Sequence, residues 1–126
     1  MIKSVKILCA MVGLLMAGCV SAPMQIAGLE FVNETDMPIT GVELRVVGTY
    51  EVAACNYISP RGRFSTKFPL LEYRGNEIEV VWKDRLGKHH FGPKVIYPPD
   101  PAPSGPVMAV ISLHPAGHAY GSFAEQ

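Results

Sequence analysis

The sequence predicts an all-β protein, built as a single antiparallel β-sandwich, and three observations predict this class. Apolar and polar residues alternate every two positions in several short runs after residue 28, as in strands that bury one face. Turn-forming residues separate these runs at intervals of about 8 to 14 residues. No stretch of ten or more residues in this region keeps the periodicity of a helix.

The clearest alternation lies at residues 42–46, where Val42, Leu44 and Val46 are separated by Glu43 and Arg45. Two other runs show the same pattern and supply these apolar rows: Phe64, Thr66 and Phe68, and then Ile78, Val80 and Trp82. We expect these rows to face each other and to form the core, with Trp82 near its centre.

Turn signals fix where the strands end. The segments 35–38, 59–62, 74–76, 84–87 and 115–117 each contain the Asp, Asn, Gly or Pro residues that tight reversals need. The strands are accordingly predicted at 28–33, 41–47, 51–57, 63–68, 77–83, 88–97, 107–113 and 118–123. Seven or eight short strands in one domain indicate a sandwich of immunoglobulin-like type, with a small closed barrel as the alternative.

Residues 98–106 break this rhythm, because they contain five prolines. Such a segment is extended and solvated, since proline fixes φ and cannot donate a backbone hydrogen bond. We interpret it as a stiff crossover between the sheets. The alternative is a binding loop that, together with an exposed strand edge, contacts a partner protein.

The N-terminus carries a targeting signal. Lys3 and Lys6 precede an apolar run from residue 7 to 17, which is about half the length that a spanning helix requires. The run ends in Met16-Ala17-Gly18-Cys19, which resembles the lipobox of bacterial lipoprotein precursors. Ordinary secretory cleavage after Ala22 is the alternative, but Pro23 would then become the first mature residue.

The resemblance implies that Cys19 receives the lipid and becomes the mature N-terminus. It divides the chain into a signal peptide (1–18), a lipidated tether (19–27) and the β-sandwich domain (28–126). Because Val20 is not aspartate, the resemblance implies an anchor on the periplasmic face of the outer membrane. The protein then reaches the membrane through its acyl chains and needs no other cofactor.

Charge argues against nucleic acid as a partner. Without Lys3 and Lys6, nine of the 11 basic residues remain against 11 acidic ones, for a net charge of about −2. Phosphate binding needs clustered Lys and Arg, and the chain has no such cluster.

Of the three cysteines, Cys9 leaves with the signal peptide and Cys19 carries the lipid, so only Cys55 remains. The domain must therefore be stable without an internal disulfide. The neighbours of Cys55 are apolar, which favours a buried, inert thiol.

The four histidines raise the question of a periplasmic copper or zinc site. His114 and His118 flank the turn at residues 115–117, so they would face each other across a hairpin and supply two ligands. His89 and His90 are adjacent, so at most one of them points to a given face. A stable site needs three or four ligands, so we expect no bound metal.

Catalysis has no sequence support, because no serine lies in a glycine elbow and no acidic pair stands apart from the strand alternation. Asn33-Glu34-Thr35 matches a glycosylation triplet, which carries little weight in a bacterial chain.

The five tyrosines lie near predicted strand ends, where they would pack as corners or form a carbohydrate-binding platform. We expect a non-catalytic binding or scaffolding lipoprotein with an unidentified envelope partner; metal handling and carbohydrate binding are the alternatives.

Overall fold

The structure is a computed structural model that describes residues 24–125. The predicted signal peptide (1–18) and the predicted lipidation site, Cys19, lie outside the described residues. Eight strands and one short 3-10 turn follow one another: β1 (Met24–Asn33), β2 (Ile39–Val46), β3 (Val52–Ile58), β4 (Arg63–Tyr73), β5 (Glu77–Asp84), β6 (Gly87–Val95), β7 (Val107–His114), η1 (Pro115–Gly117) and β8 (His118–Glu125). No α-helix occurs among the described residues.

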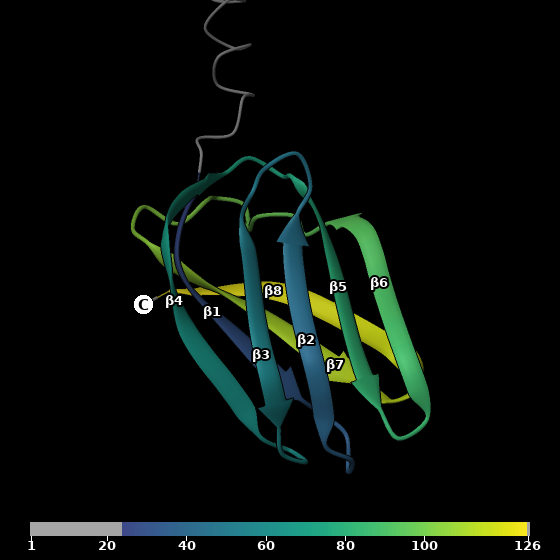
Figure 1. The fold of residues 1–126 in the computed structure, drawn as a ribbon. Coiled ribbons are helices and arrows are strands. Elements are labelled where there is room, and N and C mark those ends of the chain that lie inside the picture. Colours follow the sequence, from purple (N-terminus) through teal and green to yellow (C-terminus); the bar gives the residue numbers. More distant parts are fainter. Residues whose placement is uncertain (1–23, 126) are drawn as a thin grey trace, which may run out of the picture.

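The strands form two four-stranded sheets that pack face to face, as a sandwich does (Figure 1). The first sheet has the order β4-β1-β7-β8 and the second has the order β3-β2-β5-β6. The predicted sandwich architecture is therefore confirmed.

The prediction that the sandwich is antiparallel throughout is wrong in one place, because β1 and β7 pair in parallel while the other five pairings are antiparallel. Each strand reverses the direction of the one before it, so all odd-numbered strands run the same way. When β1 and β7 become neighbours, their pairing has to be parallel. Sequence alternation predicts where strands lie but does not predict which strands pair.

The strand order also differs from that of immunoglobulin constant domains. Those domains place their first, second, fourth and fifth strands in one sheet. Here the first and fourth strands share a sheet with the seventh and eighth, while the second and fifth lie in the other sheet. The two-layer architecture is common to both, but the connections between the layers are not.

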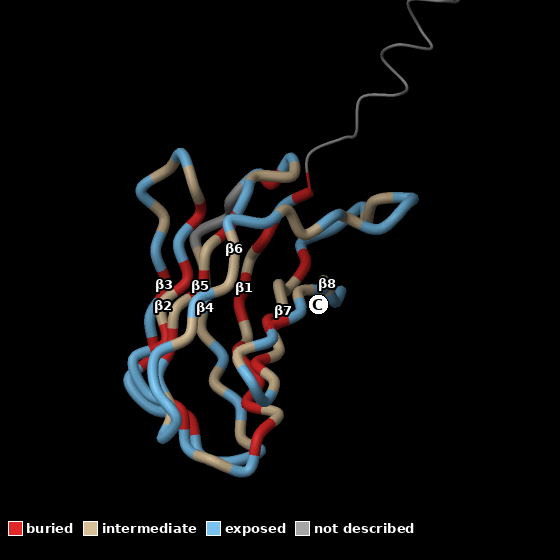
Figure 2. The backbone as a smooth tube through the Cα atoms, turned by 90° about the vertical axis from the view of Figure 1, so that its right-hand side faces the viewer, coloured by how far each residue is buried: buried red, intermediate tan, exposed pale blue. Residues whose placement is uncertain are grey.

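The core lies between the sheets and consists of the apolar rows predicted from the alternation. Val42, Leu44 and Val46 are buried, and Trp82 is only 1% exposed. Phe64 and Phe68 are partly buried against the same cluster. Figure 2 shows the buried residues along the interior and the exposed ones in the turns. Each buried Val, Leu or Phe contributes on the order of 1.5 to 3 kcal/mol to the free energy of unfolding.

Strand β1 begins at Met24, so the tether predicted at 19–27 extends too far into the chain. Met24 and Ile26 are buried, and they belong to an apolar cluster with Tyr73 and Val107. The pairing register of β1 shifts between Ile26 and Gly28, which marks a β-bulge. The extra residue changes the phase of the alternation. Met24 and Ile26 are at even-numbered positions and Leu29 is at an odd-numbered one, so the sequence does not show them as one apolar row.

A buried asparagine joins two loops, β1–β2 and β3–β4, at the end of the sandwich where β1 finishes. Asn33 is 0% exposed, and its Nδ2 donates to the carbonyl oxygens of Met37 at 2.8 Å, Ser59 at 3.1 Å and Ile58 at 3.3 Å. Its Oδ1 accepts hydrogen bonds from the backbone N and the Oγ1 of Thr35. A side chain so enclosed cannot carry a glycan, so the triplet at 33–35 has a structural role.

Substitution Asn33→Ala should lower the free energy of unfolding by about 3 kcal/mol, because it leaves several buried backbone groups without partners. Asn56→Ala, at an exposed position of β3, is the matched control and should change this free energy by less than about 0.5 kcal/mol. Urea denaturation followed by circular dichroism measures both values. Equal effects of the two substitutions would contradict the role assigned to Asn33.

Candidate functional site

The histidines lie in separate places rather than in one cluster. His114 and His118 pair directly across the β7–β8 turn, as predicted. The ring of His114 packs edge-on against that of Tyr120, with 4.8 Å between the ring centroids. His90 Nε2 lies 3.8 Å from a carboxylate oxygen of Glu79 on the neighbouring strand. Within residues 24–125, no three His, Cys, Asp or Glu side chains are placed to hold a metal ion.

The pairing of His89 with Asp84 was not predicted from the sequence. His89 Nε2 lies 3.0 Å from Asp84 Oδ2, and both side chains are largely buried. A Cβ on Gly117 would lie 2.9 Å from His89 Nδ1, so the glycine allows the β7–β8 turn to approach the ring. The pair joins the two strands of the β5–β6 hairpin, and the His89 ring lies beside the β7–β8 turn of the other sheet, so both residues have a structural role.

Four of the five tyrosines are exposed, and they do not form one platform. Tyr50 and Tyr97 lie at the end of the sandwich where the chain enters β1, whereas Tyr57 is on β3 and Tyr120 is on β8. The fifth, Tyr73, is buried and has the corner role that the sequence analysis allowed. Its hydroxyl oxygen lies 2.9 Å from the carbonyl oxygen of Asn76 and 2.8 Å from that of Ile96, so its one hydrogen has two acceptors within reach.

Burial raises the pKa of the Tyr73 hydroxyl above its ordinary value of 10.0, and a backbone hydrogen bond from Ile96 opposes this only in part. The unfolded chain therefore loses this proton near pH 10, while the folded chain keeps it. Stability should fall as the pH rises above about 10, because the folded state then holds more protons than the unfolded state.

We predict that Tyr73→Phe makes this alkaline loss of stability less steep, although the lost hydrogen bonds lower stability at neutral pH. Tyr57→Phe, at an exposed position, should leave the slope unchanged. Denaturation midpoints between pH 8 and 11 test this, in pH steps of about one half. Identical slopes for Tyr73→Phe and the unsubstituted protein would refute the assignment.

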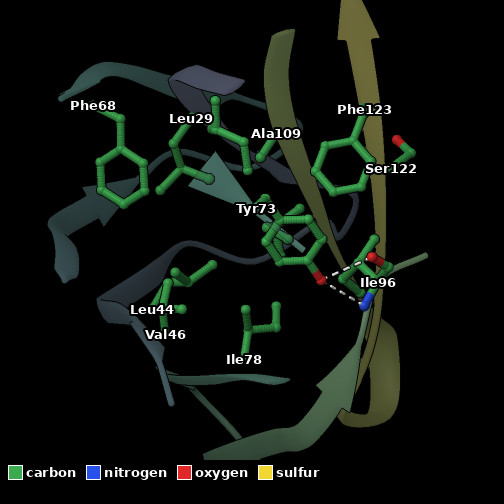
Figure 3. A pocket seen from close by; sticks show the side chains of 12 residues that line it. Leu29, Leu44, Val46, Phe68, Tyr73, Ile78, Ile96, Ala109, Ser122 and Phe123 are labelled. Atoms are coloured by element: carbon green, nitrogen blue, oxygen red, sulfur yellow. Dashed lines mark hydrogen bonds between the residues drawn. The ribbon is translucent and has the colours of Figure 1, made fainter. Parts of the chain in front are cut away.

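A small cavity lies between the sheets near the start of β1 (Figure 3). Its volume is about 30 Å³, and apolar side chains from both sheets line it, among them Leu44, Ile78 and Phe123. Small-molecule sites are on the order of 300 to 1,000 Å³. The cavity is too small for such a ligand, and it marks imperfect packing of the core.

Cys55, predicted to be buried, is indeed buried, and its Sγ lies 3.4 Å from the carbonyl oxygen of Tyr57.

The sheet edges differ in how they are protected. Strands β4 and β8 are the edges of the first sheet, and β3 and β6 are those of the second. Charged residues and prolines on edge strands oppose the addition of another strand. β4 carries Arg63 and Lys67 with Pro69, and β6 carries Lys88 and Lys94 with Pro93. Both of these edges therefore carry such protection.

Strand β8 has none of these features over residues 118–124. It contains no Lys, Arg, Asp, Glu or Pro before Glu125, and it pairs with β7 over eight consecutive residues without a bulge. Its other edge pairs with no strand of the described residues. Strand β3 is also uncharged. However, a hollow of about 320 Å³ lies between β3 and β4, and Glu51 and Lys67 are in its lining, so charged residues adjoin this edge.

The outer face beside β8 is uncharged as well. Alternation places eight residues without a formal charge on the outer face of β7 and β8: Met108, Val110, Ser112, His114, His118, Tyr120, Ser122 and Ala124. The outer face of the second sheet instead carries Glu43, Arg45, Glu77, Glu79, Lys83 and Lys88. We call the outer face of β7 and β8, together with the free edge of β8, the β8 surface.

The proline-rich connection at 98–106 adjoins the β8 surface. It joins β6 of the second sheet to β7 of the first, which confirms the predicted crossover. It ends at Val107, which pairs with Glu125 at the end of β8. Pro99, Pro101 and Pro106 are exposed. The two features that the sequence analysis assigned to a partner surface therefore meet at one place.

No protein-family model matches the chain, and no curated protein matches it. The structure is similar to the NMR structure of a protein from Eubacterium rectale, with a TM-score of 0.51 and 9% sequence identity. The similarity covers 81% of this chain and 90% of that chain. At this identity the similarity shows the fold alone. Residues 24–125 contain no helix with the length and apolar character needed to cross a membrane.

Proposed function

We propose that this chain is a small bacterial lipoprotein of the cell envelope, anchored through Cys19 to the periplasmic face of the outer membrane. Its β-sandwich is a non-catalytic binding or scaffolding domain that shares the two-layer architecture, but not the strand order, of immunoglobulin-like domains. The observation that carries the binding role is the unprotected edge of β8 beside an uncharged sheet face.

The anchor rests on the lipobox resemblance of Met16-Ala17-Gly18-Cys19. The first strand begins only five residues after Cys19, at Met24. Five residues span at most about 18 Å when fully extended. An acylated Cys19 would therefore hold the domain close to the bilayer.

Replacement of Cys19 by serine should abolish acylation, so the precursor should accumulate uncleaved. Intact-mass analysis of the unsubstituted protein should show the mature chain beginning at Cys19 with diacylglyceryl and acyl groups attached. Cys55→Ser is the matched control and should be processed normally, because that thiol is buried in the sandwich. An unsubstituted protein that lacks acyl mass would rule out the anchor.

The binding role follows from the physics of sheet edges. An edge strand presents backbone N–H and C=O groups that an added strand can satisfy, and proteins usually block this addition with charges or proline. β8 lacks such a block along its uncharged stretch. We infer that its partner is an extended, uncharged segment of another envelope protein, since the β8 surface offers no formal charge to pair with a charged one.

The proline-rich connection would support this contact from the side. Prolines fix φ in advance, so the segment loses less conformational entropy when it contacts a partner. Metal handling through His114 and His118 is the alternative with some geometric support, because those two side chains face each other. A carbohydrate platform has less support, since the exposed tyrosines are dispersed.

The substitution Ser122→Lys tests the β8 surface, since a lysine there places a charge on the uncharged edge. It should reduce the amount of partner recovered after mild detergent extraction by at least about tenfold, which corresponds to 1.4 kcal/mol. Ala54→Lys, at an exposed position on the other uncharged edge, β3, is the matched control and should leave recovery unchanged. Reduced recovery with Ala54→Lys alone would place the partner on β3 instead.

A further inference from the structure

One end of the sandwich gathers the chain's entry point and two exposed tyrosines. We call it the β1-entry end and define it as the turns at 47–51 and 74–76 with the connection at 96–106. Its parts are joined by contacts: Val47 N donates to Glu77 O at 2.9 Å, and Glu77 pairs with Val95. The chain enters β1 at the same end (Figure 1), where Met24 pairs with Tyr73.

Tyr50 and Tyr97 are held in exposed positions by ordered backbone. Tyr50 is fully exposed (102%) on a turn in which Thr49 Oγ1 donates to Val46 O at 2.9 Å and accepts from Glu51 N at 3.0 Å. Tyr97 is 80% exposed and follows Ile96, whose backbone N and O both bond to the buried Tyr73 hydroxyl. Neither exposed ring contributes to the core of the sandwich.

We propose that the β1-entry end rests on the lipid surface, with the rings of Tyr50 and Tyr97 in the headgroup layer. The inference rests on the proposed acylation of Cys19, because a segment of at most about 18 Å keeps this end beside the bilayer. Tyrosine suits this layer, since its ring is apolar and its hydroxyl bonds to water and headgroups.

The charge of this end selects the kind of lipid. Its charged residues are only Glu51, Arg74 and Asp100, and Arg74 pairs with Glu72 at 3.4 Å. Binding to anionic headgroups requires clustered basic residues, which this end lacks. The expected surface is therefore zwitterionic phospholipid.

Fluorescent labels can locate the contact on the mature, acylated protein in phosphatidylcholine vesicles that contain headgroup-quencher lipid. A Cys55→Ser background leaves one free thiol, introduced as Arg74→Cys at the β1-entry end or as Leu86→Cys at the opposite end. We expect quenching at position 74 to exceed that at position 86 by at least threefold. Equal quenching at both positions would overturn the orientation.

The tyrosines are tested separately from the tether. In the position-74 reporter, Tyr50→Asp with Tyr97→Asp should reduce quenching at least twofold, while Tyr57→Asp with Tyr120→Asp should leave it unchanged. Undiminished quenching in the first pair would show that the tether alone places this end, and would overturn the proposal. Intact mass of each sample reports acylation independently. An unmodified Cys19 would instead overturn the proposed anchor, and with it this inference.

Discussion

The hydrogen bonds of Asn33 are the constraint on which the arrangement of both sheets depends. The residue ends β1, a central strand of the first sheet. It bonds to Met37 in the loop before β2, to Ile58 at the end of β3 and to Ser59 in the loop before β4. It thus joins the two loops through which the chain passes between the sheets at this end. The backbone adds to the connection, since Asn33 N donates to Gly62 O and Glu34 N donates to Leu113 O, both at 2.8 Å.

The free edge of β8 follows from this framework. β1 occupies the interior of the first sheet between β4 and β7, and the last strand pairs with β7 and ends the sheet. The opposite edge, β4, carries charge and proline. The asymmetry between the two outer faces then concentrates the uncharged surface over β7 and β8. A binding role for this surface and a lipid-facing role for the β1-entry end are compatible, because they share only the connection at 98–106, while β7 and β8 lie outside the β1-entry end.

Much of the fold could be predicted from the sequence, because the rows of Val42 and Trp82 follow simple alternation and the turns have characteristic residues. The start of β1 could not, because its bulge changes the phase of the alternation. The parallel pairing of β1 with β7 depends on contacts distant in sequence. A glycine inside a strand can indicate that another part of the chain approaches closely. Gly121 in β8 is such a glycine, because a Cβ there would lie 2.6 Å from the side chain of Ile96. The β8 surface was predicted only as an unspecified edge, since edges follow from strand order.

Hydrogen exchange of the acylated protein, measured alone and in the complex recovered by mild detergent extraction, tests the central claim about β8 most directly. The backbone amides on the free side of an edge strand exchange readily until another strand pairs with them. The account predicts that residues 118–125 gain protection in the complex, while Val52–Ile58 of the other uncharged edge exchange as before. Protection gained in β3 and not in β8, or confined to the turns, would contradict it.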